Sequence, residues 1–462
     1  MKVLFVVPNW KYHQLKYTSA TIFTPKSIPL EFLYVKKMLN SEIQSKILDA
    51  NVLDLSTNYT IEEIKQWNPN IVVFSTAINY LQWRCPPIDL DIPRNLAQEC
   101  KKMGITTIAV GPHGTTTPEE IINEVGTDYL ILGEPEISLT RFINSKLEDN
   151  KIPGVYSHKF NNGPAMEISM CDLPIPDYDA IDQKLYECHT WSNNVNSYLK
   201  KNNFKGAIIE FSRGCMFNCP FCLRFEFRKN YRKKSIDQMR KEVKILKDMG
   251  IKYLFFIDEI FNIESDDLSC LLDTLAEEEL LFGCQARPDY MTYELITKFK
   301  KSGCIYIEYG IESFSEEVLK KINKNIDINM VKKVLLYTYQ IIGKENTMLG
   351  LINFYTNDIK KILGLKDENT KWVSKVVRPY PGSLIGEKLL ELYNIKEAKW
   401  DFILRYTWWE QIENFSNYFK DGIAQDPNIK QKILFDSMEK SKEISYRYMR
   451  SYKEKFISSE KK

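Results

Sequence analysis

Short apolar runs alternate with amphipathic stretches along the first 150 residues of the chain. Residues 2–7 and 71–75 are almost entirely apolar, as in strands that are buried on both faces of a sheet. The stretches between such runs repeat their apolar residues at the spacing of a helix. This alternation predicts a doubly wound parallel sheet, a Rossmann-like α/β domain over residues 1–150. Strands are expected at residues 2–7, 45–48, 71–75, 106–110 and 129–132, and helices at residues 29–39, 61–67, 96–103, 118–125 and 137–145.

A second alternating unit follows an irregular stretch at residues 151–200, which contains the sequence Leu-Pro-Ile-Pro-Asp and is expected to be an interdomain linker. Six strands with intervening helices predict a partial, open (β/α)6 barrel of the TIM type over residues 201–390, with its chemistry at the carboxyl ends of the strands. Residues 391–462 are predicted to form a mainly helical C-terminal region. The barrel strands are expected at residues 207–212, 253–258, 282–287, 305–311, 348–354 and 373–378, and the helices at residues 236–249, 268–277, 293–301, 316–322 and 330–342.

Composition and charge exclude several classes of protein. The 63 Lys and Arg residues balance 61 Asp and Glu residues, a net charge of +2, so no nucleic-acid partner is expected. No apolar run approaches the roughly 20 residues that span a bilayer, and the first residues lack a signal-peptide cleavage pattern. We therefore expect a cytoplasmic protein without a membrane partner. Ten cysteines in 462 residues are too few for a secreted disulfide scaffold.

Three of the cysteines are closely spaced. Residues 213–222 read Arg-Gly-Cys-Met-Phe-Asn-Cys-Pro-Phe-Cys, which places Cys215, Cys219 and Cys222 in one loop with C-x3-C-x2-C spacing. Three thiolates on one loop can converge on a metal centre. They are one short of the four ligands that close a structural zinc site, whereas on a 4Fe–4S cubane they leave one iron open. A zinc site completed by Cys188 or His189 is the alternative.

This spacing, with an aromatic residue before the last cysteine, resembles the radical S-adenosylmethionine (radical SAM) superfamily. Residues 255–259, 285–289 and 309–313 resemble its second, third and fourth strands in order and spacing. The resemblance implies a 4Fe–4S cluster whose open iron binds the amino and carboxylate groups of S-adenosylmethionine. It also implies that the backbone at Phe221 contacts the adenine. Candidates for contacts with the ribose, ammonium and carboxylate are Asp258, Glu259, Arg287, Glu308, Glu312 and Ser313.

A doubly wound domain ahead of a radical domain resembles the cobalamin-dependent radical enzymes. Residues 29–34, 49–51, 111–113, 133–136 and 380–383 resemble segments of that group. Many cobalamin domains carry a D-x-H-x-x-G pattern whose histidine binds cobalt, and this chain lacks it. The lower face of the cobalamin is therefore expected to lack a histidine ligand, with Tyr80, Trp83 or Arg84 near it. Beyond the carboxyl ends of the strands, the cobalamin-binding candidates are Ser75, Thr76, Tyr80, Trp83, Arg84, Gly111, His113, Gly133 and Glu134.

Two further segments allow two interpretations each. A basic run after the cysteines is expected to be a solvated helix start, and the alternative is recognition of a phosphate- or carboxylate-bearing substrate. Trp400, Tyr406, Trp408 and Trp409 are expected to pack on the barrel, and the alternative is that they cap its cavity. The basic run consists of Arg224, Arg228, Lys229, Arg232, Lys233 and Lys234.

The resemblance implies a methyltransferase that acts on an unactivated carbon, or on phosphorus, of a small metabolite or natural-product intermediate. The reaction would use a 5′-deoxyadenosyl radical and methylcobalamin. One alternative is cyclisation, rearrangement or oxidation with the same cofactors but without methyl transfer. An alternative of another class is a zinc-binding regulatory protein. The expected partners are a small-molecule substrate and an electron donor such as flavodoxin or ferredoxin.

Overall fold

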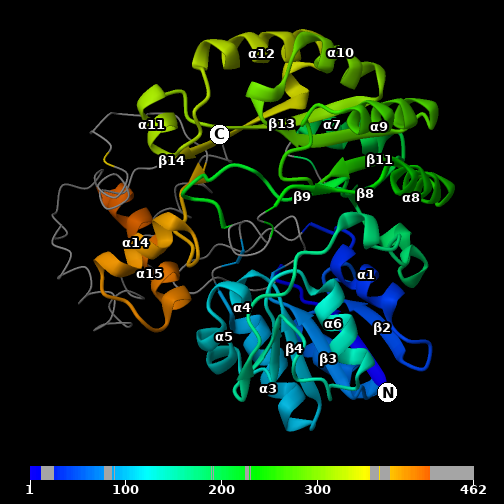
Figure 1. The fold of residues 1–462 in the computed structure, drawn as a ribbon, viewed down its shortest axis with the longest axis vertical. Helices are drawn as coiled ribbons and strands as arrows, with labels where there is room; N and C mark the ends of the chain where they lie inside the picture. Colours follow the sequence, from blue (N-terminus) through cyan, green and yellow to red (C-terminus); the bar gives the residue numbers. More distant parts are fainter. Residues whose placement is uncertain are drawn as a thin grey trace, which may run out of the picture.

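The computed structural model describes residues 1–11, 25–77, 86–87, 89–188, 190, 192–223, 228, 230–353, 364 and 375–416. Within these residues the chain forms two parallel-sheet domains and a C-terminal helical region (Figure 1). In that view the first domain, blue to cyan, lies below the green barrel, and the orange helices α14 (Leu384–Leu392) and α15 (Lys399–Ser416) lie beside them. The predicted α/β fold class is confirmed.

The first sheet has the strand order β2-β1-β3-β4-β5-β6-β7. Its first five strands are parallel, as the apolar runs predict, and β3 and β4 span the predicted residues. The strands are β1 (Lys2–Val7), β2 (Gln44–Asp49), β3 (Ile71–Ser75), β4 (Thr106–Val110), β5 (Tyr129–Ile131), β6 (Val155–Ser157) and β7 (Phe160–Asn161).

Both faces of this sheet are covered by helices, which explains why its central strands β1 and β3 are almost entirely apolar. Phe5 packs on Phe32 of α1, with ring centroids 5.2 Å apart, on the face that α1 and α6 cover. The side chain of its neighbour Leu4 points to the other face of the sheet, where it packs in a hydrophobic cluster with residues of α2, α3 and α5. The helices are α1 (Leu30–Met38), α2 (Thr57–Trp67), α3 (Asp91–Lys102), α4 (Pro112–Thr116), α5 (Pro118–Val125) and α6 (Pro135–Asn144).

Residues 151–200, which are predicted to be an interdomain linker, contain regular secondary structure. Strand β6 pairs antiparallel with β5, and β7 pairs antiparallel with β6, so the first sheet extends into residues 155–161. Three short 3-10 helices and α7 (Asn193–Lys201) follow. The prolines do interrupt long elements, but backbone hydrogen bonding to the free edge of β5 still extends the sheet.

The second sheet has the order β15-β14-β13-β12-β11-β8, in which every pairing is parallel and follows the sequence order. This is the partial barrel that the sequence predicts. Its strands are β8 (Lys205–Ile209), β11 (Ile251–Phe256), β12 (Leu281–Ala286), β13 (Cys304–Glu312), β14 (Thr347–Asn353) and β15 (Lys375–Val376). Its helices are α8 (Ile236–Asp248), α9 (Asp266–Glu277), α10 (Tyr293–Lys301), α11 (Glu316–Lys321) and α12 (Ile328–Ile341).

The C-terminal helices pack on the first domain. The Trp400 ring lies 4.3 Å from that of His113, centroid to centroid, and its Nε1 donates to Thr117 Oγ1 at 2.8 Å. Trp400 and Tyr406 are buried in the hydrophobic cluster that includes α3 and α5. The expectation that these two residues pack on the barrel is therefore wrong, because α15 docks on the other domain. The side chains of Trp408 and Trp409 lie outside the described residues.

The carboxyl ends of the two sheets face each other. Glu134 follows β5 of the first sheet, and Arg213 follows β8 of the second, yet their side chains form an ion pair of 3.5 Å. Loops that follow parallel strands are where such sheets bind ligands. The fold therefore brings the two predicted ligand-binding edges together. No helix among the described residues combines the length and apolar character needed to cross a membrane.

Candidate active site

The cysteine loop begins and ends in a short antiparallel ribbon, β9 (Ser212–Arg213) with β10 (Arg232–Lys233). Cys215, Cys219 and Cys222 are half-buried thiols, and Cys222 N donates to Cys219 O at 3.1 Å in a tight turn. The loop is also held by α14, because Ile385 N donates to Pro220 O at 3.0 Å. The ribbon and α14 thus hold the three thiols at the junction of the two domains.

The donor set fits an iron–sulfur cubane, in which each of the three thiolates would bind a different iron atom and the fourth iron would stay open. Burial raises the pKa of Cys219, and Cys215 adds to the rise, whereas Lys324 and Arg287 oppose it. Two cations therefore lie near a thiolate ligand of the proposed anionic cluster.

The described candidate for a fourth zinc ligand lies elsewhere. Cys188 packs against Gly206, near the start of β8, whereas the cysteine loop follows the end of that strand. Burial also raises the pKa of Cys188, which disfavours the thiolate that a metal needs. His189 lies outside the described residues.

Two of the residues predicted to contact S-adenosylmethionine bind the backbone ahead of the cysteine loop. Asp258 is fully buried and accepts hydrogen bonds from Phe211 N at 3.1 Å and from Ser212 N and Oγ, both at 2.6 Å. Burial raises its pKa to about 7, although these hydrogen bonds oppose the rise. Glu259 accepts from Gly214 N at 2.9 Å. Both carboxylates are therefore occupied in fixing the residues that precede Cys215.

Arg287 and Glu312 come together near the cysteines through a residue that the sequence did not single out. Arg287 binds Asp289 with two hydrogen bonds of 2.9 and 2.8 Å and donates to Lys324 O at 3.0 Å. Lys324 Nζ in turn pairs with Glu312 Oε1 at 3.1 Å. Lys324 is 7% exposed. No sequence signal marks it, because a lysine between asparagines after a short helix resembles a surface residue.

The remaining candidates for S-adenosylmethionine are more dispersed. Glu308 accepts from Gln285 Nε2 at 3.3 Å, across two adjacent strands near their carboxyl ends. Ser313 Oγ accepts from Ser315 N at 3.0 Å, which is a local turn contact. Phe221 is half-buried against the small hydrophobic cluster that contains Val377. The role of its backbone at the adenine stays a prediction.

The cobalamin candidates of β3 and β4 form one group. Thr76 N donates to Val110 O at 2.8 Å, and a Cβ at Gly111 would lie 2.4 Å from Thr76 Oγ1, so the two loops touch. Ser75 Oγ accepts from Ala77 N at 3.3 Å. Gly111 and Gly133 have φ of 133° and 90°, which glycine adopts most easily. Such small, close loops fit a large planar cofactor at this edge.

His113 and Glu134 are committed to contacts within the protein. His113 Nε2 donates to Pro87 O at 2.5 Å, and its Nδ1 lies 3.0 Å from Thr76 Oγ1. Burial lowers the pKa of His113 to about 4, so the ring is neutral. Glu134 binds arginines of the other domain. Both side chains thus have partners within the protein, and their contact with cobalamin stays a prediction. Tyr80, Trp83 and Arg84 lie outside the described residues.

Among the described residues of the basic run, Arg228, Arg232 and Lys234 are largely buried, which fits neither a solvated helix start nor an exposed anion site. Lys233 is partly exposed and pairs with Asp267. Arg228 is 1% exposed and Lys234 is 2% exposed. Lys234 Nζ pairs with Glu242 Oε2 at 2.5 Å, and Arg228 and Arg232 pair with glutamates. The solvated interpretation is wrong for these residues because the first domain covers them.

A parallel-sheet domain facing a partial barrel, with a three-cysteine loop between them, defines the class of radical SAM enzymes that carry an additional cofactor domain. The family model of the radical SAM superfamily matches residues 209–365, and that of the B12 binding domain matches residues 23–143. The first range contains the cysteine loop, which favours the cluster over the zinc alternative.

Individual relatives agree with these matches. An uncharacterised methyltransferase of Pyrococcus horikoshii is 23% identical over 92% of this chain and 90% of its own length. The anaerobic magnesium-protoporphyrin IX monomethyl ester cyclase of Rubrivivax gelatinosus is 26% identical over 76% of this chain and 63% of its own length. The solved structure of the radical SAM methyltransferase TsrM from Kitasatospora setae, with cobalamin and a [4Fe-4S] cluster bound, has a TM-score of 0.62 at 16% identity, over 86% of this chain and 76% of that one. The last likeness shows a shared fold.

The chain is a cobalamin-dependent radical SAM enzyme of the methyltransferase-like group. Its cofactors are a 4Fe–4S cluster, S-adenosylmethionine and cobalamin, as the sequence predicts. The assignment of individual residues to these cofactors stays a prediction.

Replacing Gly214 with alanine is expected to distort the cysteine loop. Gly214 has φ of 87°, and a Cβ there would lie 2.0 Å from Asn230 O. The left-handed backbone costs an alanine about 1–2 kcal/mol, and relieving the overlap costs roughly another 1–3 kcal/mol. Gly250→Ala is the matched control, because Gly250 has φ of 83° but no atom within 4 Å of its Cβ position. Thermal unfolding and iron content after reconstitution measure both variants. Equal losses of thermal stability and iron content in Gly214→Ala and Gly250→Ala would contradict the expected overlap with Asn230.

Proposed function

We propose that this protein is a cobalamin-dependent radical SAM methyltransferase that methylates an unactivated carbon, or phosphorus, of a small metabolite or natural-product intermediate. The observation that carries the proposal is the ion pair between Glu134 and Arg213, because it joins the ligand-binding edge of the cobalamin-binding sheet to the residue two positions before Cys215. A substrate held between these edges would reach both cofactors. The methyltransferase names of the Pyrococcus and Kitasatospora relatives also support it.

The bound cofactors supply radical generation and a transferable methyl group. The chain supplies binding, orientation and exclusion of water. Cys215, Cys219 and Cys222 would hold the cluster. The buried cations Arg287 and Lys324, which lie near Cys219, would orient the carboxylate of S-adenosylmethionine by charge. The closed contact between α15 and the first domain would limit the entry of water from that side.

The test is anaerobic incubation of the reconstituted protein with S-adenosylmethionine labelled on its methyl group, a low-potential reductant and candidate substrates. We expect labelled product together with 5′-deoxyadenosine, measured by mass spectrometry. Flavodoxin or ferredoxin is the proposed physiological electron donor, and either should replace the chemical reductant. Label that never leaves S-adenosylmethionine and cobalamin, across a broad substrate panel, would rule out methyl transfer. The cytoplasmic location stays a prediction.

A second function is favoured by the similarity to the Rubrivivax cyclase. Cyclisation, rearrangement or oxidation would use the same three cofactors and release 5′-deoxyadenosine. It would give an unlabelled product whose mass changes by the loss of hydrogen or by an added oxygen, or does not change at all. The same incubation therefore separates the two functions.

A further inference from the structure

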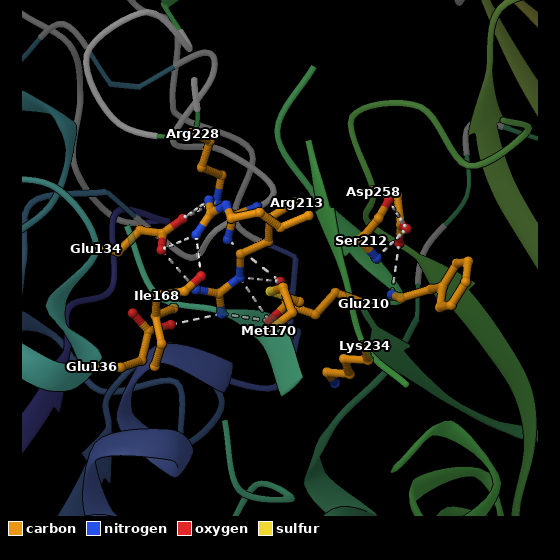
Figure 2. Close-up of polar contacts among 12 residues, drawn as sticks. Glu134, Glu136, Ile168, Met170, Glu210, Ser212, Arg213, Arg228, Lys234 and Asp258 are labelled. Atoms are coloured by element: carbon orange, nitrogen blue, oxygen red, sulfur yellow. Dashed lines mark hydrogen bonds and ion pairs between the residues drawn. The ribbon is translucent and has the colours of Figure 1, made fainter. Parts of the chain in front are cut away.

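A cluster of buried ion pairs lies between the two domains (Figure 2). We call it the interdomain ion cluster. None of its side chains is more than 14% exposed. Its members are Glu134 and Glu136 from the first domain, and Glu210, Arg213, Arg228, Arg232 and Glu259 from the barrel.

Arg213 lies at the centre of this cluster, with a fully buried side chain. Its Nη2 pairs with Glu136 Oε1 at 2.6 Å, and its Nε donates to both carboxylate oxygens of Glu210 at 3.1 Å. Its Nη1 lies 3.5 Å from Glu134 Oε2. One guanidinium thus joins two carboxylates of the cobalamin-binding domain to one of the barrel.

The other two arginines follow the cysteines along the chain and reach the same acids. Arg232 donates to both oxygens of Glu134, at 3.0 and 2.7 Å. Arg228 pairs with Glu210 at 3.4 Å and with Glu259 at 3.2 Å, and its Nε lies 3.9 Å from Glu134. Glu134 of the first domain is therefore paired with Arg213, which precedes the cysteine motif, and with Arg228 and Arg232, which follow it.

The cluster reaches the cysteine loop itself through Glu259. The carboxylate of Glu259 accepts from Gly214 N at 2.9 Å while it pairs with Arg228. Gly214 is the residue directly before Cys215. A continuous path of hydrogen bonds and ion pairs thus runs from Glu134, after β5, to the backbone that carries the first thiol.

Stability alone does not explain such a cluster. Desolvating several ions costs about as much as their attraction returns, and apolar residues of similar volume often stabilise a fold equally well. Directed ion pairs differ from apolar packing in that they fix one geometry, above all when a planar guanidinium binds several acids. Burial opposes the ionisation of Glu210, yet Arg213 and Arg228 lower its pKa to about 2, so the charges persist at neutral pH.

We propose that the interdomain ion cluster is a positioning device, with Arg213 as its central positioning residue, that sets the distance between the iron–sulfur cluster and the cobalt. The two redox centres belong to different domains, and these ion pairs connect the strand ends that present them. The inference depends on the cofactors alone and not on methyl transfer, so the failure of one proposal leaves the other intact.

The test measures this distance in the holoenzyme. The reduced cluster and cob(II)alamin both carry unpaired electrons, so pulsed electron paramagnetic resonance reports their separation without any substrate. We expect Arg213→Lys to keep both cofactors but to shift and broaden the distribution of distances between them. The compact ammonium group of lysine cannot replace the planar guanidinium, whose donors contact Glu134, Glu136 and Glu210 at the same time. Glu134→Gln, which keeps the shape of the acid and removes its charge, should give a change of the same kind.

Arg94→Lys is the matched control. Arg94 pairs with Asp91 and with Glu124, the latter at 3.2 Å, and all three belong to the first domain. This variant should leave the distance unchanged. Wild-type distances in both Arg213→Lys and Glu134→Gln would overturn the proposal. So would the loss of either cofactor in both variants, because the cluster would then be required for assembly and not for placement.

Discussion

Cys219→Ser is expected to abolish the reductive cleavage of S-adenosylmethionine. Serine keeps the size of the side chain but removes the thiolate that iron requires, so the cluster should not assemble in full. We expect the rate of 5′-deoxyadenosine formation under strong reduction to fall at least about a thousandfold, or roughly 4 kcal/mol in activation free energy. Iron and sulfide analysis, and the absorbance near 400 nm, should fall with it.

Two controls make this result specific. Cys270→Ser changes a half-buried cysteine of α9, outside the cysteine loop, and should keep the cluster and the cleavage rate. Cys219→Ser itself should still bind cobalamin, seen in its visible spectrum, because that cofactor belongs to the other domain. Undiminished cleavage in Cys219→Ser, or a preparation that carries zinc in place of iron, would remove the basis for the radical chemistry.

Glu31→Gln is expected to stabilise the protein at alkaline pH. Glu31 lies in the first turn of α1, and its fully buried carboxyl oxygens have no hydrogen-bond partner among the residues that the structure describes. Burial raises its pKa from 4.5 to about 8, and Glu136 and Asp49 add to the rise, whereas its own backbone and Arg228 oppose it. The folded protein therefore holds this proton up to about pH 8, whereas the unfolded chain releases it near pH 4.5.

The sign follows from proton linkage. Between those two pH values the unfolded state loses its proton first, so the wild type becomes less stable as pH rises, by up to roughly 5 kcal/mol for this pKa difference. Glutamine cannot ionise, so the variant should lack that part of the loss. Unfolding by urea at pH 6 and pH 9 measures the difference, with the exposed Glu62→Gln in α2 as the control. Parallel pH profiles for wild type and Glu31→Gln would show that Glu31 is not held neutral.

The sequence alone predicts the local features of this protein. The sequence predicts the strands at residues 71–75 and 106–110 residue for residue, because the central strands of a parallel sheet are buried on both faces and are therefore mostly apolar. The cysteine motif was equally clear, because its three ligands lie within eight residues and the chemistry depends on that spacing. The fold class follows from the alternation of such strands with helices, and the cofactors follow from the family resemblance that the cysteine motif and the segments around it carry.

Only the tertiary structure decided what the charged residues do. Asp258 and Glu259 bind the backbone ahead of the cysteines, a role that the sequence does not indicate, and their contact with S-adenosylmethionine stays a prediction. Arg228 was expected to be solvated, and Lys324 was not singled out, yet both are buried. The physical reason is that the burial of a loop charge depends on which distant segment covers it and which partner that segment brings. Sequence spacing determines neither, so the ion cluster between the domains became visible only when the two sheets were placed edge to edge.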